Sequence, residues 1–480
     1  MQRLLNKYMS TNSLKYKTIR DISDLIKNRK ISSTEISKYF LKRLSDYGYK
    51  YNAIVTLLPE LAEELSAKAD NSKKHNGLLH GIPYGIKDLI SVSYLDLKIN
   101  KGYNPATTWG ATPLKDQKFN YTATVIKKLN IAGAIPLAKL SMVELAGGMG
   151  YKYPDASITG PGINPWDQTK WAGGSSSGSG SAVAAGLVPF ALGTETWGSI
   201  LIPSAYCGIT GLRPTLGLVS RHGTMALSWT LDKIGPMGLS ADDCGIILNA
   251  ISGFDPKDSS SSRKKFSYIN NYNQLAKPNI AIFKDILTQC SQSIKANFND
   301  SVNELSKFAN IYEIDLPEYP YDLVIQTISN AESSSSLEDI IDSGLLRGLT
   351  AVEDRYSSIP RSLISAKDYI KALRMRKIIL SITKNIFKKY DALIAPTRPT
   401  TALPLDENFR DSFKSTKDPM GSIGNLAGLP AISLPNGFDK KNKLPTALQI
   451  MSRPYSENFL IAMGKKYQSI TNWHTKSPEI

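Results

Sequence analysis

The chain has 480 residues, of which 41% are hydrophobic and 21% charged, with 34 glycines and 26 prolines. This composition excludes a disordered, collagen-like or coiled-coil chain, and the length is ample for a large buried core. The formal net charge is +16, and residues 1–80 carry fifteen Lys and Arg against eight Asp and Glu, whereas residues 171–250 carry three against four. We therefore expect no direct binding of nucleic acid.

No apolar run reaches the roughly 18 residues that a spanning helix needs, so no membrane partner is expected. Residues 1–15 form a basic tail without acidic residues, loosely similar to a mitochondrial presequence. The cysteines are too few and too widely spaced for a disulfide framework or a zinc site: Cys207, Cys244 and Cys290. The sequence favours a cytoplasmic location, with a mitochondrial one as the alternative.

The first predicted element is an amphipathic helix that begins near Ser32. Ser32 and Glu35 have the spacing of a capping box. The apolar residues that then fall on one face are Ile36, Tyr39, Phe40 and Leu44.

Residues 81–90 predict a turn and a short apolar strand that carries Lys87. Residues 123–142 predict a helix followed by a strand. This alternation is typical of an α/β protein.

The middle of the chain is rich in glycine and serine, and residues 173–186 read GGSSSGSGSAVAAG. A flexible linker would have this composition, but an apolar strand follows at once in residues 187–195. We therefore expect crowded backbone packing at this segment.

Polar connections are expected at residues 257–275 and 332–336. After Asp391 the pieces ALIAP, PAISLP and TALQIM predict buried strands that return to the sheet begun in the first half. That return predicts one domain over residues 16–480.

The sequence holds four histidines and no pair at metal-ligand spacing, so we expect no metal and no cofactor. The glycine-rich stretch matches neither of the common phosphate-binding patterns. Residues 174–178 formally fit the GxSxG nucleophile elbow, but a polar loop precedes them where that motif needs a strand.

The remaining possibility is a reaction at a serine for which the sequence offers no obvious histidine as base. A serine hydroxyl is a weak nucleophile until a base removes its proton, and a buried lysine with a lowered pKa can be that base. Lys87 is the single cation in the apolar run LLHGIPYGIKDLI. A lysine at a strand end, paired with Asp88, explains this pattern equally well.

Four blocks of the sequence resemble the amidase signature family: GIPYGIKD, GGSSSGSGSAVAAG, GTETWGSILIPSAYCGITGLRPT and NLAGLPAISLPNGF. The resemblance extends roughly from Tyr16 to Gln468. It implies an α/β fold with a mixed central β-sheet sandwiched by α-helices, and a Ser/cis-Ser/Lys triad. Carried over by position, the nucleophile is Ser199, the bridging serine Ser175 and the lysine Lys87. Ser175 would relay a proton between the other two.

The family also implies an oxyanion hole of backbone N–H groups just before the nucleophile, here Thr196, Trp197 and Gly198. The sequence departs there from the commoner D-x-G-G-S-I-R pattern, with Glu195 for the acid, Trp197 for a glycine and Leu201 for the arginine. If that glycine has a positive φ, Trp197 is strained; otherwise its indole forms a wall of the acyl pocket.

The remaining residues of interest have structural interpretations. His80 and His222 are expected to make local hydrogen bonds, and Cys207 to be a small buried hydrophobic residue. Residues 142–145 are expected either to line the acyl pocket or to pack in the core.

The resemblance implies hydrolysis of a carboxylic amide, of a small molecule or a peptide, through an acyl-Ser199 intermediate that releases ammonia or an amine. A homodimer is compatible with the sequence. One alternative is the glutamine-hydrolysing A subunit of a tRNA-dependent amidotransferase, which needs protein partners and which the departures from the motif disfavour. The other is a catalytically silent relative that acts as a binding module, with Trp197 plugging the site.

Overall fold

The computed structural model describes residues 14–480, apart from residue 74 and residues 100–101, 273–275 and 413–417. Residues 1–13 of the predicted basic tail lie outside the described residues. In the described chain, eleven strands form one sheet, in the order β1 (Ile54–Leu57), β3 (Ile135–Leu140), β2 (Pro83–Lys87), β6 (Ala191–Glu195), β8 (Lys233–Gly238), β7 (Thr210–Arg213), β12 (Ala431–Phe438), β13 (Pro445–Ser452), β11 (Ala392–Pro396), β9 (Asn279–Phe283) and β10 (Asn310–Ile314).

The large sheet is mixed, as predicted. β2 runs parallel to both β3 and β6, and β9 runs parallel to β10 and β11. The pairs between β6, β8, β7, β12, β13 and β11 are antiparallel. Strands from both halves of the chain therefore share one sheet. The prediction that residues 16–480 form a single domain stays a prediction.

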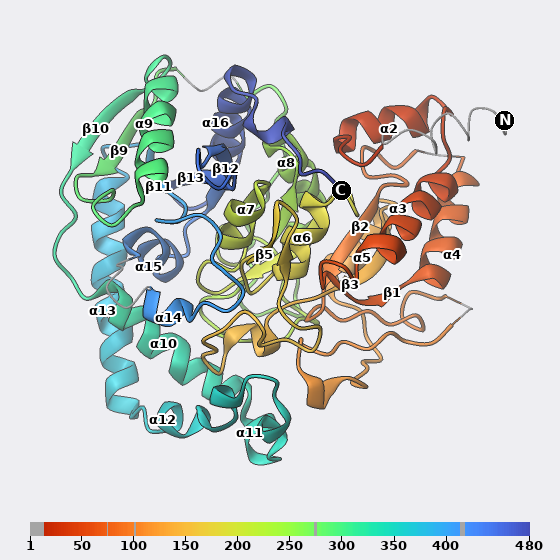
Figure 1. Ribbon diagram of the computed structural model, residues 1–480, viewed down its shortest axis with the longest axis horizontal. Coiled ribbons are helices and arrows are strands. Elements are labelled where there is room, and N and C mark those ends of the chain that lie inside the picture. The colour runs from red at the N-terminus through yellow and green to blue at the C-terminus, as the bar shows by residue number, and fades with distance from the viewer. Residues whose placement is uncertain (1–13, 74, 100–101, 273–275, 413–417) are drawn as a thin grey trace.

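Helices flank this sheet along its whole length (Figure 1). A separate two-stranded sheet is formed by β4 (Ile163–Asn164) and β5 (Asp167–Trp171). The helices are α2 (Ile19–Lys27), α3 (Ser33–Tyr47), α4 (Pro59–Asp70), α5 (Thr124–Ile131), α6 (Ser177–Ala184), α7 (Leu201–Cys207), α8 (Ala241–Ile251), α9 (Gln292–Ser306), α10 (Tyr321–Ser336), α11 (Glu338–Asp342), α12 (Ser358–Ser362), α13 (Ala366–Ile386), α14 (Phe409–Ser412), α15 (Pro419–Leu426) and α16 (Glu457–Ile470).

The central strands are covered on both faces. Every residue of β2, β6, β7 and β8 is buried, which requires packing on each side of the sheet. α6 packs on α7 and α8 packs on α16, and both pairs contact central strands. In Figure 1 the N-terminal helices α2–α5 lie at one end of the molecule and α9, α10 and α13 at the other.

The local sequence signals account for several of these elements. The capping box of Ser32 and Glu35 is present at the start of α3, and Ile36, Phe40 and Leu44 are buried behind it. β2 carries Lys87, and β11, β12 and β13 lie where the apolar pieces after Asp391 predict strands.

The prediction of a polar connection at residues 332–336 is wrong. These residues form the last turn of α10, and Glu332 is buried. Its carboxylate accepts hydrogen bonds from Thr230 N (2.9 Å) and from the hydroxyls of Ser228 and Tyr369, at 2.5 and 2.8 Å. A serine-rich helix end looks like a loop in sequence because the partners that bury it are distant.

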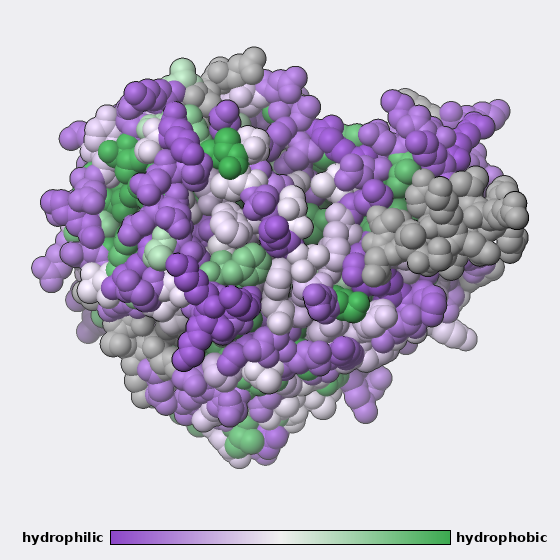
Figure 2. All heavy atoms as spheres, turned by 45° about the horizontal axis from the view of Figure 1, so that its top comes forward, coloured by the Kyte–Doolittle hydropathy of each residue, from purple (hydrophilic) through white to green (hydrophobic). Residues whose placement is uncertain are grey.

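Among the described helices, none has the length and apolar character to cross a membrane. The face of the molecule in Figure 2 is largely hydrophilic, and its apolar areas are small and separate.

The side chain of Arg43 joins α3 to the end of α6, with donated bonds to Gly186 O (2.8 Å) and Ala185 O (3.0 Å). We expect Arg43→Ala to lower the free energy of unfolding by about 1–3 kcal/mol, because two buried carbonyls lose their donors. Lys42→Ala, which removes only an exposed pair with Asp46, is the matched control. Urea denaturation of both variants measures the difference, and equal midpoints would contradict the assignment.

Candidate active site

Lys87 ends strand β2 and is wholly buried. Its Nζ donates to Ser175 Oγ at 2.7 Å and to Thr194 Oγ1 at 2.9 Å. The neighbouring Asp88 pairs instead with Lys139, at 3.0 Å. The alternative interpretation of Lys87 as a strand-end partner of Asp88 is therefore wrong.

The environment of Lys87 favours its neutral form. Burial lowers the pKa of the amine to about 7, against the opposing influence of the carboxylates of Asp232 and Glu195. The neutral amine that a base requires is therefore accessible near neutral pH.

Ser175 lies in the crowded turn that leads into α6. The Gly174–Ser175 peptide bond is cis, as the resemblance implies. Gly173 has a φ of 84°, and a Cβ on it would lie 2.9 Å from Pro203 Cα. The glycine-rich sequence therefore reflects close backbone packing, as predicted, and not a flexible linker.

Ser199 follows β6 and precedes α7, and it is half-buried at the wall of a cavity of about 670 Å³. Thr196 and Trp197 line the same cavity. In the described chain, Ser175 Oγ accepts from Lys87, and no hydrogen bond joins Ser175 to Ser199. Among the described residues, no hydrogen bond donated by the backbone N–H groups of residues 196–198 is found.

Trp197 is accommodated without backbone strain. The positive φ in this loop belongs to Gly198, at 85°, and Trp197 is not among the residues with a positive φ. The indole Nε1 donates to Asp418 Oδ2 at 3.2 Å. Trp197 therefore forms part of the cavity wall, and Ser199 still lines the cavity beside it.

Several residues that support the site were missed by sequence reasoning. The Glu195 carboxylate pairs with Arg213 at 2.7 Å, and both side chains are fully buried. Arg213 thus supplies a guanidinium near the loop in which this chain has Leu201 in place of the arginine of the motif. Asp232 accepts a hydrogen bond from the Thr196 hydroxyl. Arg213 is the one cation in the apolar stretch before Pro214, which is the same signal that marks Lys87.

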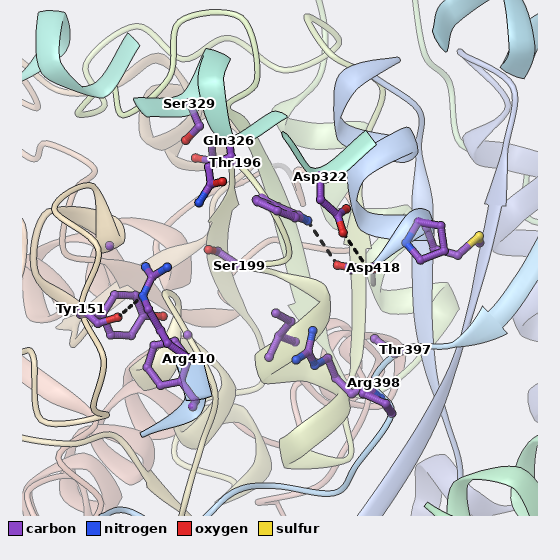
Figure 3. A pocket seen from close by; sticks show the side chains of 18 of the residues that line it. Tyr151, Thr196, Ser199, Asp322, Gln326, Ser329, Thr397, Arg398, Arg410 and Asp418 are labelled. Atoms are coloured by element: carbon purple, nitrogen blue, oxygen red, sulfur yellow. Dashed lines mark hydrogen bonds between the residues drawn. The ribbon is translucent and has the colours of Figure 1, made fainter. Parts of the chain in front are cut away.

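The cavity has charged side chains of both signs. In Figure 3, Arg410 and Tyr151 lie on one side of Ser199, and Asp322 and Asp418 lie on the other. Burial raises the pKa of Asp418, although its amide donor at Gly421 N (2.9 Å) opposes the shift.

Two arginines meet in the cavity wall. A Cβ on Gly150 would lie 2.5 Å from Arg361 Nη2 and 3.5 Å from Arg410 Nη2, so the guanidinium groups are neighbours. Burial, together with the Arg410 charge, lowers the pKa of Arg361 to about 10, even though Asp354 opposes this. Within the described residues, neither arginine has a carboxylate ion pair.

The other residues named from sequence take structural roles. His80 Nε2 lies 3.1 Å from Ala69 O, and Cys207 is buried with Sγ 3.3 Å from Ala172 O. The His222 ring contacts Tyr121. Residues 142–145 are buried in the core and do not line the cavity, whereas residues 146–148 do. Among the described residues, no group of three potential ligands could hold a metal ion.

Comparison with known proteins gives the family. The model of the Amidase family matches residues 35–461. The chain belongs to this family. Its members hydrolyse carbon–nitrogen bonds of amides, and so the chain is an amide hydrolase.

The relatives include both A subunits of amidotransferases and a peptide amidase. The A subunit of glutamyl-tRNA(Gln) amidotransferase from Acinetobacter baumannii (strain AB0057) is 34% identical, over 96% of this chain and 98% of its own length. The peptide amidase of Stenotrophomonas maltophilia is 25% identical in structural alignment, with a TM-score of 0.83, over 96% of this chain and 98% of its own. The structure of the glutamyl-tRNA(Gln) amidotransferase A subunit from Thermotoga maritima has a TM-score of 0.79 at 26% identity, over 98% and 99% of the two chains.

A role of Lys87 as a neutral base would give amide hydrolysis a defined pH dependence. Because the pKa of Lys87 is about 7, its active form is lost as the pH falls through 7. We expect kcat/KM for amide hydrolysis to fall about tenfold per unit below that pH and to level off above it. Ammonia release between about pH 5 and 9 measures the profile. A rate that stays constant from the acid end to neutrality would contradict this role of Lys87.

Proposed function

We propose that the chain hydrolyses carboxylic amides through an acyl-enzyme on Ser199, with Ser175 as proton relay and Lys87 as base. The observation that carries the proposal is the 2.7 Å contact of the buried Lys87 amine with Ser175 Oγ. A neutral amine in this position can accept a proton through the hydroxyl of Ser175 and return it later.

In the first half-reaction, Ser199 Oγ attacks the amide carbon while its proton passes through Ser175 to Lys87. The carbonyl oxygen becomes an oxyanion that the N–H groups of residues 196–198 can bind. When the C–N bond breaks, the proton on Lys87 returns through Ser175 to the leaving nitrogen, which departs as ammonia or an amine.

In the second half-reaction, water attacks the acyl ester on Ser199. The same relay takes the proton of the water molecule and gives it to Ser199 Oγ as the ester bond breaks, so the carboxylic acid leaves and the enzyme is restored. No cofactor takes part in this scheme.

The variants Ser199→Ala, Ser175→Ala and Lys87→Ala test this triad. We expect each to lower ammonia release by at least about 10³-fold, because the three groups act as one unit. The substrates are a small aliphatic amide, an aromatic amide, a C-terminal peptide amide and glutamine, and Ser204→Ala, at a buried serine of α7 outside the relay, is the control. Full activity of any of the three variants would refute the scheme.

A second candidate function is glutamine hydrolysis as the A subunit of a tRNA-dependent amidotransferase, which would act with partner subunits. The identity with such subunits supports it. So does the cavity wall, because the guanidinium groups of Arg361 and Arg410 suit an α-carboxylate, and the carboxylates of Asp322 and Asp418 suit an α-ammonium group.

Arg361→Met distinguishes the two candidates. If glutamine is the substrate, we expect its KM to rise about 10- to 100-fold, as the loss of a hydrogen bond to a charged group predicts. Turnover of the neutral aliphatic amide should change less than about twofold, and Arg347→Met, an exposed arginine that does not line the cavity, is the control. Equal effects of Arg361→Met on both substrates would contradict recognition of a carboxylate by this arginine.

A further inference from the structure

The loop that carries Ser199 is held at its C-terminal end by a buried carboxylate. Glu195 Oε2 accepts the backbone N–H of Ile200 at 2.9 Å and of Leu201 at 3.1 Å. Glu195 is itself the last residue of β6, and Leu201 is the first residue of α7. The carboxylate thus ties the end of the strand to the start of the helix, across the segment that holds Ser199.

The other oxygen of Glu195 is held by the sheet and by α15. Arg213 Nη1 donates to Oε1 at 2.7 Å and Asn425 Nδ2 donates to it at 3.2 Å. Asn425 also accepts from Lys233 Nζ, at 2.5 Å. Burial would raise the pKa of Glu195, but the charges of Arg213 and Lys233 lower it to about 2, which favours the carboxylate form.

The N-terminal end of the same loop is held by a second buried carboxylate. Asp232 accepts from the Thr196 hydroxyl through Oδ1. Its Oδ2 accepts from Leu227 N at 2.8 Å and Ser228 N at 2.9 Å. Residues 196–199 therefore lie between two fixed points, although the four residues belong to neither a strand nor a helix.

We propose that Glu195 is a positioning residue for the nucleophile: its carboxylate holds the segment after Ser199, and Asp232 holds the segment before it, so that Ser199 Oγ and the N–H groups of residues 196–198 keep one geometry through the reaction. The proposal rests on the acyl-enzyme function proposed above. Such alignment matters because a displacement of about 1 Å at a reacting centre can cost 10²-fold in rate.

Glu195→Gln is a sharp test because the amide has nearly the shape of the carboxylate and no charge. All four partners of Glu195 are donors, two on each oxygen. Whichever way the glutamine amide is turned, its NH₂ group faces two donors, so one of the two anchors is lost. Glu195→Asp keeps the charge and shortens the side chain by one methylene.

We expect Glu195→Gln to lower the plateau of kcat/KM, and the rate of Ser199 labelling by a fluorophosphonate, about 100-fold. Removal of a negative charge near Lys87 also favours the neutral amine, so the acid limb of the pH profile should move to lower pH. Glu195→Asp should lower the plateau without moving the limb. If Glu195 had only a structural role, the acid limb of the pH profile would not differ between Glu195→Gln and Glu195→Asp in this way.

The control is Glu457→Gln, because Glu457 is also buried and accepts from Thr215 N and Thr215 Oγ1, which lie outside the loop. Amide hydrogen exchange of the peptide that spans residues 196–204 gives a readout that needs no activity. Exchange there should be faster than in the native protein for Glu195→Gln and unchanged for Glu457→Gln.

The outcomes separate the two proposals. If the native protein neither hydrolyses amides nor reacts with the fluorophosphonate, the acyl-enzyme function fails, and the exchange data still decide whether Glu195 holds the loop. If exchange of residues 196–204 and the acid limb are both unchanged in Glu195→Gln, the positioning role is overturned whatever the activity. Should Glu195→Gln fail to fold, the exchange and plateau of Glu195→Asp decide the question, and native values would overturn the proposal.

Discussion

Lys87 carries an amine into the interior of the sheet, where it contacts the hydroxyls of Ser175 and Thr194 and, within the described chain, no carboxylate at ion-pair distance. An ammonium group in such surroundings loses its hydration, and the two nearest carboxylates compensate only in part. The pKa of the amine therefore falls to the range in which it can exchange protons near neutrality. The position depends on β2, which lies between β3 and β6 and is covered on both faces, so that water is kept from the amine.

Ser175 contacts Lys87 directly, whereas Ser199 lies at the other end of the same structural unit. Ser175 lies just before α6, and Ser199 lies just after β6, the strand that pairs with β2. Pairing of these strands brings the end of β6 beside the end of β2, which is why Lys87 lies within hydrogen-bond distance of Thr194 although the two are far apart in sequence. The cavity is then completed by later segments, which contribute Asp322 from α10 and Asp418 from the start of α15. The residues of the proposed triad and the acidic residues of the cavity wall thus come from different parts of the chain.

Sequence reasoning recovered several of the strands from their apolar pattern, whereas the three catalytic candidates were assigned from the family resemblance. Lys87 is one cation in an apolar run, and the glycine-rich block indicates crowded backbone around Ser175. Asp88 could not be assigned from its position beside Lys87, since its partner, Lys139, lies on β3. Glu332 looked like part of a loop for the same reason, because the groups it binds are more than thirty residues away in sequence. The arginines of the cavity wall could not be predicted from the sequence either, because nothing in a polar segment indicates that the guanidinium of an arginine faces a cavity. In each case the missing information is a tertiary contact.

The most direct test of a lysine-activated serine is the site and pH dependence of covalent labelling by a fluorophosphonate. Intact-mass spectrometry and peptide mapping would compare the native protein with Lys87→Ala at several pH values. We predict one adduct, on Ser199, that forms faster as the pH rises through about 7 in the native protein and only slowly at every pH in Lys87→Ala. An adduct on another residue, or equal labelling rates of Ser199 in the two proteins, would contradict the claim that a buried neutral lysine activates this serine.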